Sequence, residues 1–185
     1  MTLLPSPPGG AAPLTLGFRL SSLVGVNLIR LESDGDGVVE FQFGTLDGLA
    51  FTYTQPGVYM PTVFVTDDQG QRSGLTLVQV FDPISLDVQL QAVWNGFKDA
   101  VRAGDLASAE GFLHTDTRDD YEEQLALLNP VTLANVDQIM TTINPVEIGF
   151  GGAQYEMLRV QDGQTLSFAV WFQIDQDGLW RLRRF

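Results

Sequence analysis

The sequence contains no cysteine and only one histidine, His114. Disulfide bonds, thiol catalysis and cysteine-ligated zinc are therefore excluded, and any histidine-based triad or metal site would need that single imidazole. The lack of cysteine does not decide the compartment, because exported proteins can also do without disulfide bonds.

Positive charge and long apolar runs are also scarce. Ten Lys and Arg residues stand against 23 Asp and Glu residues, which gives a net charge of −13. Binding to nucleic acid or to an anionic membrane surface is therefore not expected. No run approaches the roughly 20 apolar residues of a membrane helix, so membrane insertion is not expected either. The first residues lack a positive region followed by an apolar one, so we expect no signal peptide here.

What the sequence does have is enough apolar material for a folded protein. Hydrophobic residues make up 44% of the 185 residues, which is ample for one large core or two small ones. Residues 1–13 differ from the rest, because they are dominated by Pro, Gly and Ala. This composition predicts a flexible lead-in.

Residues 14–83 have the pattern of short strands separated by turns. Apolar and polar side chains alternate in "VVEFQFG" (38–44), as in a half-buried strand. Similar segments follow at short spacing, with turns expected at 55–57 and 68–70. The pattern predicts an all-β immunoglobulin-like sandwich.

Residues 84–185 begin with a helical period. Apolar residues between 86 and 101 recur at helical spacing, Gly104 is expected to end that helix, and Asp105 to cap the next. Two more helices are expected at 117–128 and 131–143, each closed by an Asn-Pro pair.

The strand period then returns. Segments 154–160, 165–174 and 179–185 alternate, and Asp162-Gly163 predicts a hairpin turn. Helices followed by a curved antiparallel sheet make an α+β domain. The expected organisation is a lead-in (1–13), a β-sandwich (14–83) and an α+β domain (84–185).

The first domain resembles the polycystic-kidney-disease (PKD) domain, an immunoglobulin-like sandwich common in exported bacterial proteins. The resemblance lies in "YTQPGVYMPTVFVTDDQGQ" (53–71), with its Pro56-Gly57 pair, Tyr59 and the Val65-Thr66-Asp67 triplet. The Trp-Asp-Phe-Gly-Asp-Gly strand of that family is approximated by Phe41-Gln42-Phe43-Gly44, which implies a divergent member.

The second domain resembles nuclear-transport-factor-2-like (NTF2-like) domains, which are cystatin-like in fold and are appended to bacterial surface proteins. The matching segments are "LQAVWNGFKDAVRAGDLASAEGFL" (90–113) and "DGLWRLRRF" (177–185). In that family the cone of sheet and helices can hold a ligand, host an active site or do neither, so the fold alone does not imply a function.

The most chemically suggestive stretch surrounds two glycines with Glu32, Asp34, Asp36 and Glu40. An EF-hand is excluded, because its twelfth position needs a bidentate Glu where this chain has Phe43, and strands are expected on both sides. Two interpretations remain. The glycines supply the positive φ angles of a hairpin loop, or the four carboxylates also hold Ca²⁺. Turn chemistry alone accounts for both glycines and is favoured.

His114 lies in "FLHTDTRDDYEE" (112–123), between two expected helices. A catalytic interpretation would make it a base oriented by Asp116 or Asp119. No nucleophile motif supports this, and an exposed loop histidine is expected instead. The neighbouring acidic residues suit the positive end of a helix dipole, with Thr117 or Asp116 as the cap.

Aromatic residues of the second domain could line an NTF2-like cavity or simply form its core. The candidates are Trp94, Tyr121, Tyr155, Trp171 and Trp180.

Three arginines lie among the last five residues, 181–185. Strict alternation puts Arg181 and Arg183 on one face and Arg184 on the other, with Trp180 and Leu182. We expect these arginines to pair with the surplus carboxylates or to hold an anionic ligand.

These observations predict a non-catalytic pair of structural or interaction modules from an exported or cell-surface bacterial protein. The expected partners are other domains of a longer chain or other surface proteins, and calcium is the one cofactor considered. Two alternatives stay open. The second domain could bind a small ligand or act as an enzyme through an NTF2-like cavity, and the first could bind carbohydrate or protein through exposed aromatics such as Tyr53 or Tyr59.

Overall fold

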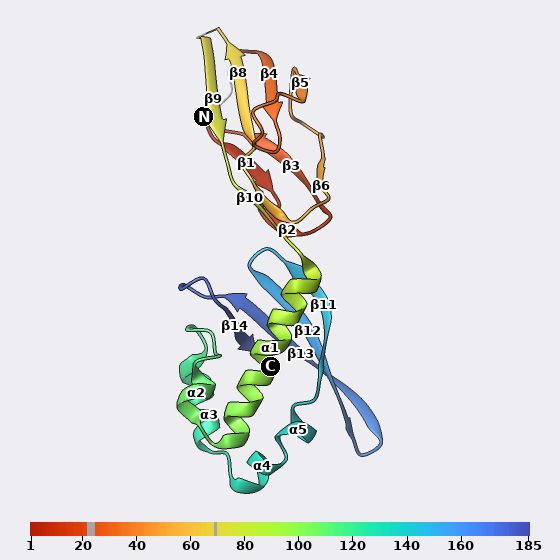
Figure 1. The fold of residues 1–185 in the computed structure, drawn as a ribbon, viewed down its shortest axis with the longest axis vertical. Helices are drawn as coiled ribbons and strands as arrows, with labels where there is room; N and C mark the ends of the chain where they lie inside the picture. The colour runs from red at the N-terminus through yellow and green to blue at the C-terminus, as the bar shows by residue number, and fades with distance from the viewer. Residues whose placement is uncertain (22–24, 69) are drawn as a thin grey trace. The chain divides into compact units, whose positions relative to one another are not determined.

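A computed structural model describes residues 1–21, 25–68 and 70–185 of the chain. The chain divides into two compact units, Met1–Pro83 and Ile84–Phe185. The division falls where the sequence changes its period. The fold is rich in strands, with a helical segment between the two sets of strands (Figure 1), and this coarse prediction is confirmed.

The described residues of the first unit form strands and no helix. The strands are β1 (Leu3–Ser6), β2 (Gly9–Ala11), β3 (Leu14–Leu20), β4 (Val26–Glu32), β5 (Phe41–Phe43), β6 (Phe51–Tyr53), β7 (Gly57–Tyr59), β8 (Thr62–Asp67), β9 (Gly70–Leu75) and β10 (Val78–Phe81). One antiparallel sheet has the order β1-β3-β6, and another has the order β5-β4-β8-β9. β10 pairs in parallel with β2 and antiparallel with β7.

The two sheets share one hydrophobic core. Alternate residues of β4 and β8 face it, because Ile29 lies opposite Val65 and Leu31 lies opposite Val63, and all four side chains are fully buried. Leu16 of β3 is buried in the same cluster. This is the alternation expected of strands with one face toward a core.

The expected flexible lead-in is wrong, because residues 1–13 contain two paired strands. β1 pairs with β3 and β2 pairs with β10, and the Leu3 side chain is only 1% exposed. Proline lacks an N–H but is tolerated at sheet edges, so a Pro-rich segment can still pair. The predicted turn at 68–70 includes residue 69, which lies outside the described residues.

The second unit carries helices first and strands afterwards. Its elements are α1 (Pro83–Ala103), α2 (Leu106–Glu110), α3 (Arg118–Ala126), α4 (Pro130–Ala134), α5 (Val136–Ile139), β11 (Ile143–Gly149), β12 (Gly152–Gln161), β13 (Gln164–Ile174) and β14 (Trp180–Arg184). The four strands pair antiparallel in the order β14-β13-β12-β11, and α1 lies against one face of this sheet (Figure 1).

α1 packs through the apolar stripe that its sequence predicts. The buried apolar residues recur three or four positions apart, so they share one side of the helix: Leu86, Leu90, Trp94, Phe97 and Val101. The predicted helix end is confirmed, since Gly104 has φ of +69°. The predicted cap is confirmed as well, because the Asp105 carboxylate accepts a hydrogen bond from the Ser108 N–H at 3.1 Å.

The expected single helix at 131–143 is wrong, because it is divided at Asn135 and its last four residues are not helical. Two short helices, α4 and α5, end at Ile139, and the following Asn144-Pro145 pair lies inside strand β11. A register shift after Pro145 marks a bulge, a position where a strand tolerates proline. Asn129 caps α4, since its side chain accepts from the Thr132 N–H at 3.0 Å.

β12 and β13 form the longest hairpin, drawn in Figure 1 as a twisted blue ribbon. Its turn is Asp162-Gly163, where φ is +51° and +77°, as a two-residue hairpin loop requires. This predicted turn is confirmed. Within the described residues, none of the helices combines the length and apolar character needed to cross a membrane.

Candidate functional site

The acidic loop of the first unit connects β4 to β5, which pair antiparallel, so it is a hairpin connection. Gly35 and Gly37 have φ of +95° and +86°, conformations that favour glycine. The turn interpretation of the two glycines is therefore confirmed. Strands flank the loop on both sides, which agrees with the exclusion of an EF-hand.

The four predicted calcium ligands do come together. One carboxylate oxygen from each of Glu32, Asp34, Asp36 and Glu40 lies within 4.8 Å of the others. Glu32 is only 4% exposed, whereas the other three are exposed. Oxygen ligands at such spacing are the kind that Ca²⁺ prefers.

Backbone N–H groups of the loop already stabilise these carboxylates. Glu32 Oε1 accepts from the N–H groups of Asp34 and Asp36, each at 3.1 Å, and from that of Gly35. The Ser33 N–H donates to Glu40 Oε2 at 2.7 Å. These bonds fold the loop without an ion, although they leave four negative charges side by side. Two unit charges about 4 Å apart repel by about 1 kcal/mol even in bulk water, and a cation would relieve this repulsion.

Tyr53 forms the inner wall of this loop. Its hydroxyl donates to the Ser33 carbonyl at 2.6 Å, and the ring lies 4.3 Å from that of Tyr59. Burial raises the pKa of the Tyr53 phenol, and the charge of Asp34 raises it further. Tyr53 is 7% exposed and Tyr59 is half-buried, so neither presents a free ring for carbohydrate or protein.

His114 is buried, at 4% exposure, so the expectation of an exposed loop histidine is wrong. The segment before it is held at the sheet: the Leu182 N–H donates to the Phe112 carbonyl at 2.9 Å, and the His114 N–H to the Leu182 carbonyl at 2.7 Å. Because the backbone of His114 is paired to Leu182 of β14, its imidazole lies in the buried interior. Its Nδ1 accepts from the Asp116 N–H at 3.2 Å, which places the proton on Nε2, 3.8 Å from Asp175 Oδ1.

Asp175 is the polar centre of this region, and it was not among the site residues predicted from the sequence. Its carboxylate is 6% exposed and accepts from the Thr115 hydroxyl at 2.7 Å, the Thr115 N–H at 3.1 Å and the Gln176 N–H at 2.8 Å. Arg181 Nε lies 3.2 Å away. Burial alone would raise the pKa of Asp175, but the hydrogen bonds from Thr115 and Gln176, with His114 nearby, lower it to about 2. The available signal was its place at the end of a strand, just before the Asp177-Gly178 turn.

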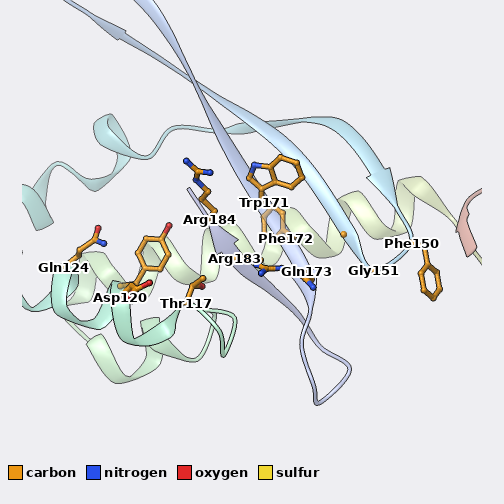
Figure 2. Close-up of a pocket in the computed structure, with 12 residues that line it drawn as sticks. Thr117, Asp120, Gln124, Phe150, Gly151, Trp171, Phe172, Gln173, Arg183 and Arg184 are labelled. Carbon is orange, nitrogen blue, oxygen red and sulfur yellow. Dashed lines mark hydrogen bonds between the residues drawn. The ribbon is translucent and has the colours of Figure 1, made fainter. Parts of the chain in front are cut away.

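A pocket of about 700 Å³ opens beside this region, between α3, the turn joining β11 to β12, and strands β13 and β14. Trp171, Arg183 and Arg184 line it from the sheet, and Asp120 and Gln124 line it from α3 (Figure 2). Its volume falls within the range of about 300 to 1,000 Å³ typical of small-molecule sites.

Arg184 lies on the face opposite to the predicted one. The register between β13 and β14 shifts between Trp171 and Phe172, so that Trp171 pairs with Arg184 whereas Phe172 pairs with Leu182. A bulge therefore breaks the strict alternation of the last strand. Arg184 shares the face of the 41%-exposed Trp171, away from the buried Leu182, and Figure 2 shows both side chains on the same side of the sheet.

The arginine pairing expected from the sequence is confirmed for Arg181 and Arg183. Arg181 reaches Asp177 at 2.5 Å, in addition to Asp175, and Arg183 lies 3.8 Å from Asp116. Within the part of the chain that the structure describes, the Arg184 side chain forms neither a hydrogen bond nor an ion pair.

Only two of the five predicted cavity residues, Tyr121 and Trp171, line the 700 Å³ pocket. Trp94, Tyr155 and Trp180 instead belong to the core, at 0%, 0% and 8% exposure. Their polar atoms are used inside the fold: Trp94 Nε1 donates to the Thr141 carbonyl at 2.8 Å, and the Tyr155 hydroxyl donates to Asp87 at 2.8 Å. Buried aromatics with satisfied polar ends are typical core residues.

A second cavity, of about 230 Å³, lies inside the helix and sheet layers of the same unit. Its lining is mainly apolar, with Phe97 from α1, Leu125 from α3 and Phe168 from β13. Tyr121 lines both cavities. The interior of the second unit is therefore only partly filled by its aromatic residues.

Thr117 occupies the cap position of α3, but its side chain makes no capping hydrogen bond. Asp119 and Asp120 lie in the first turn of the helix, where the dipole favours negative charge. Of the two orienters considered for His114 from the sequence, Asp116 does lie beside it, with Oδ2 3.8 Å from Nδ1, whereas Asp119 is not among the groups around the imidazole.

Comparison with known proteins adds little. No family model matches the sequence, and no curated protein matches it. The chain is similar to a crystal structure of an engineered protein, at 20% identity and a TM-score of 0.29, over 43% of this chain and 20% of that one. The chain thus spans about a fifth of the length of that structure.

Proposed function

We propose that the chain is a non-catalytic pair of structural or interaction modules from an exported or cell-surface bacterial protein. The first module is a PKD-like, immunoglobulin-like sandwich, and the second is an NTF2-like domain. Other domains of a longer chain or other surface proteins are the partners of such modules.

The observation that carries this proposal is a tyrosine corner in the first unit. The Tyr59 hydroxyl donates to the Gln55 carbonyl at 2.8 Å, just before β8 begins at Thr62. Immunoglobulin-like sandwiches have such a tyrosine at the start of their sixth strand, with its hydroxyl bonded to backbone a few residues upstream.

The division of the strands supports the same fold. β1, β3 and β6 form one sheet, and β4, β5, β8 and β9 form the other, as in sandwiches whose first, second and fifth strands face the third, sixth and seventh.

The second module rests on its element order. Helices come first and are followed by a four-stranded antiparallel sheet whose two central strands, β12 and β13, form a long hairpin, the arrangement expected of an NTF2-like domain. The two cavities of this unit favour small-ligand binding as a second candidate function. Carbohydrate or protein binding through Tyr53 or Tyr59 is no longer favoured, because those rings pack on each other.

Surface location predicts that protease reaches the native protein on intact cells. When cells that produce the full chain are treated with trypsin, an antibody raised against residues 84–185 should lose its signal, because exposed arginines such as Arg184 are accessible. Immunoblotting before and after cell lysis measures this. A signal that survives on intact cells, but disappears when trypsin is added after lysis, would contradict surface location.

Calcium at the acidic loop belongs to this proposal as a stabiliser of the first module. An ion that binds only to the folded state stabilises that state. If the loop binds Ca²⁺ with the affinity usual in extracellular modules, about 10 mM Ca²⁺ should raise the melting temperature of the first module by about 5–10 °C above its value in chelator. Calorimetry separates this transition from that of the second module, which should not move.

A pair of variants isolates the loop. Asp36→Asn keeps the hydrogen bond that its side chain accepts from the Val38 N–H, but removes one charge of the cluster, so the calcium response should shrink. Asp47→Asn is the matched control, because Asp47 precedes another positive-φ glycine, Gly48, outside the cluster. Equal melting temperatures with calcium and with chelator would count against the site.

A further inference from the structure

The 700 Å³ pocket holds an exposed cation in a strongly acidic chain. Arg184 is exposed and makes no ion pair within the described residues, although the chain carries a net charge of −13. Arg183 beside it is held by a hydrogen bond to the Gln173 side chain. A guanidinium presents paired N–H donors that match the two oxygens of a carboxylate.

An aromatic surface lies directly next to this cation. Trp171 pairs with Arg184 across β13 and β14, so the two side chains start from the same face about 5 Å apart at their Cβ atoms. Trp171 is 41% exposed, whereas the other two tryptophans are core residues. An exposed indole can stack on a planar ring.

The opposite wall is rigid and carries one negative charge. Tyr121 stacks on Phe185 with ring centroids 4.6 Å apart and planes 9° from parallel, and its hydroxyl accepts from the Phe185 N–H at 3.1 Å. Asp120 on the same helix also lines the pocket. A ligand with a second negative charge would approach Asp120 and be repelled.

We propose that this pocket binds a small aromatic monocarboxylate, with its carboxylate on the guanidinium of Arg184 and its ring over the indole of Trp171. The proposal rests on the second candidate function, small-ligand binding by the second unit. Arg183 adds positive charge at the same edge, and Gln124 on α3 offers amide groups to polar substituents.

The test is a titration of the full chain, followed by ¹⁵N NMR, with four probes. Benzoate carries both features, benzyl alcohol lacks the charge, acetate lacks the ring, and phenyl phosphate carries the extra charge. Benzoate should give saturable chemical-shift changes of the Trp171 indole N–H and of the Arg183 and Arg184 backbone amides. It should also bind at least about tenfold more tightly than each of the other three probes, because a hydrogen bond to a charged group contributes about a factor of ten or more to affinity.

Two variants and a control assign the site. Arg184→Gln and Trp171→Leu should each weaken benzoate binding about tenfold, because each removes one of the two interactions. Both side chains are exposed, so unchanged melting curves will show that the variants fold. Arg19→Gln removes an exposed charge from the first unit and should leave binding unchanged.

The outcomes separate the two levels of the proposal. If benzyl alcohol binds as well as benzoate, or phenyl phosphate binds more tightly, the pocket is a ligand site but the monocarboxylate class is wrong. If Arg184→Gln binds benzoate as the unaltered chain does, the assignment of the carboxylate is overturned. If no probe gives saturable shifts at the pocket, small-ligand binding there fails as well, while the module proposal is unaffected.

Discussion

Replacing Trp94 by alanine is expected to lower the free energy of unfolding of the second unit by about 3–5 kcal/mol, as for other large-to-small changes of buried aromatics. Trp94 is fully buried, packs edge-on against Phe185 at 5.8 Å, and donates its indole N–H to the Thr141 carbonyl. The variant loses the packing of α1 and leaves that carbonyl without its donor. Urea unfolding measures the change.

Tryptophan fluorescence makes the measurement specific, because all three tryptophans lie between residues 84 and 185. Trp171→Ala is the matched control. Trp171 is 41% exposed, so its loss should cost no more than about 1 kcal/mol. If the two variants lowered the urea midpoint equally, Trp94 would not have the core position described.

The second large effect is expected from Asp175→Ala, which should destabilise the second unit by about 3 kcal/mol. The substitution leaves Arg181 without the buried carboxylate 3.2 Å from its Nε, and leaves the Thr115 hydroxyl and N–H without their acceptor. Each buried donor left without its acceptor typically costs about 1–3 kcal/mol, whereas the Arg181 guanidinium keeps its ion pair with Asp177. Asp177→Asn is the control, since Asp177 also binds Arg181 but is about half exposed.

The same residue predicts a pH dependence. The pKa of Asp175 is lowered to about 2 in the folded chain from an ordinary 3.8, so the unfolded chain takes up the proton first as pH falls. The resulting stabilisation, about 2 kcal/mol, is complete above pH 5 and is lost progressively as pH falls from about 4 to 2. The stability difference between the unaltered chain and Asp175→Asn should therefore shrink over that window. A difference that is constant from pH 6 to pH 2 would contradict the low pKa.

Local patterns predicted the elements that depend on local chemistry. The period of α1, the end at Gly104, the cap at Asp105 and the Asp162-Gly163 turn all follow from residues within a few positions of each other. The glycines of the acidic loop belong to the same group. In each case the physical cause lies inside the segment that was interpreted.

The errors concern features that depend on distant partners. Residues 1–13 carry no strand period, yet β3 and β10 supply partners for them. His114 is buried only because its segment pairs with Leu182, about 70 residues later. Arg184 changed face through a bulge, whose position is set by pairing between two strands. The pocket could not be predicted for the same reason, since its lining comes from α3, the turn joining β11 to β12, and strands β13 and β14.

β1 also protects the first unit from self-association. It covers the edge of β3, whose backbone N–H and C=O groups would otherwise be open to another chain. A shortened chain beginning at residue 14 would expose that edge together with the apolar surface now covered by Leu3. The Pro-rich N-terminal segment is thus expected to reduce aggregation. Pro5 and Pro7 lack backbone N–H groups, which limits pairing between the outer edge of this segment and a strand of another chain.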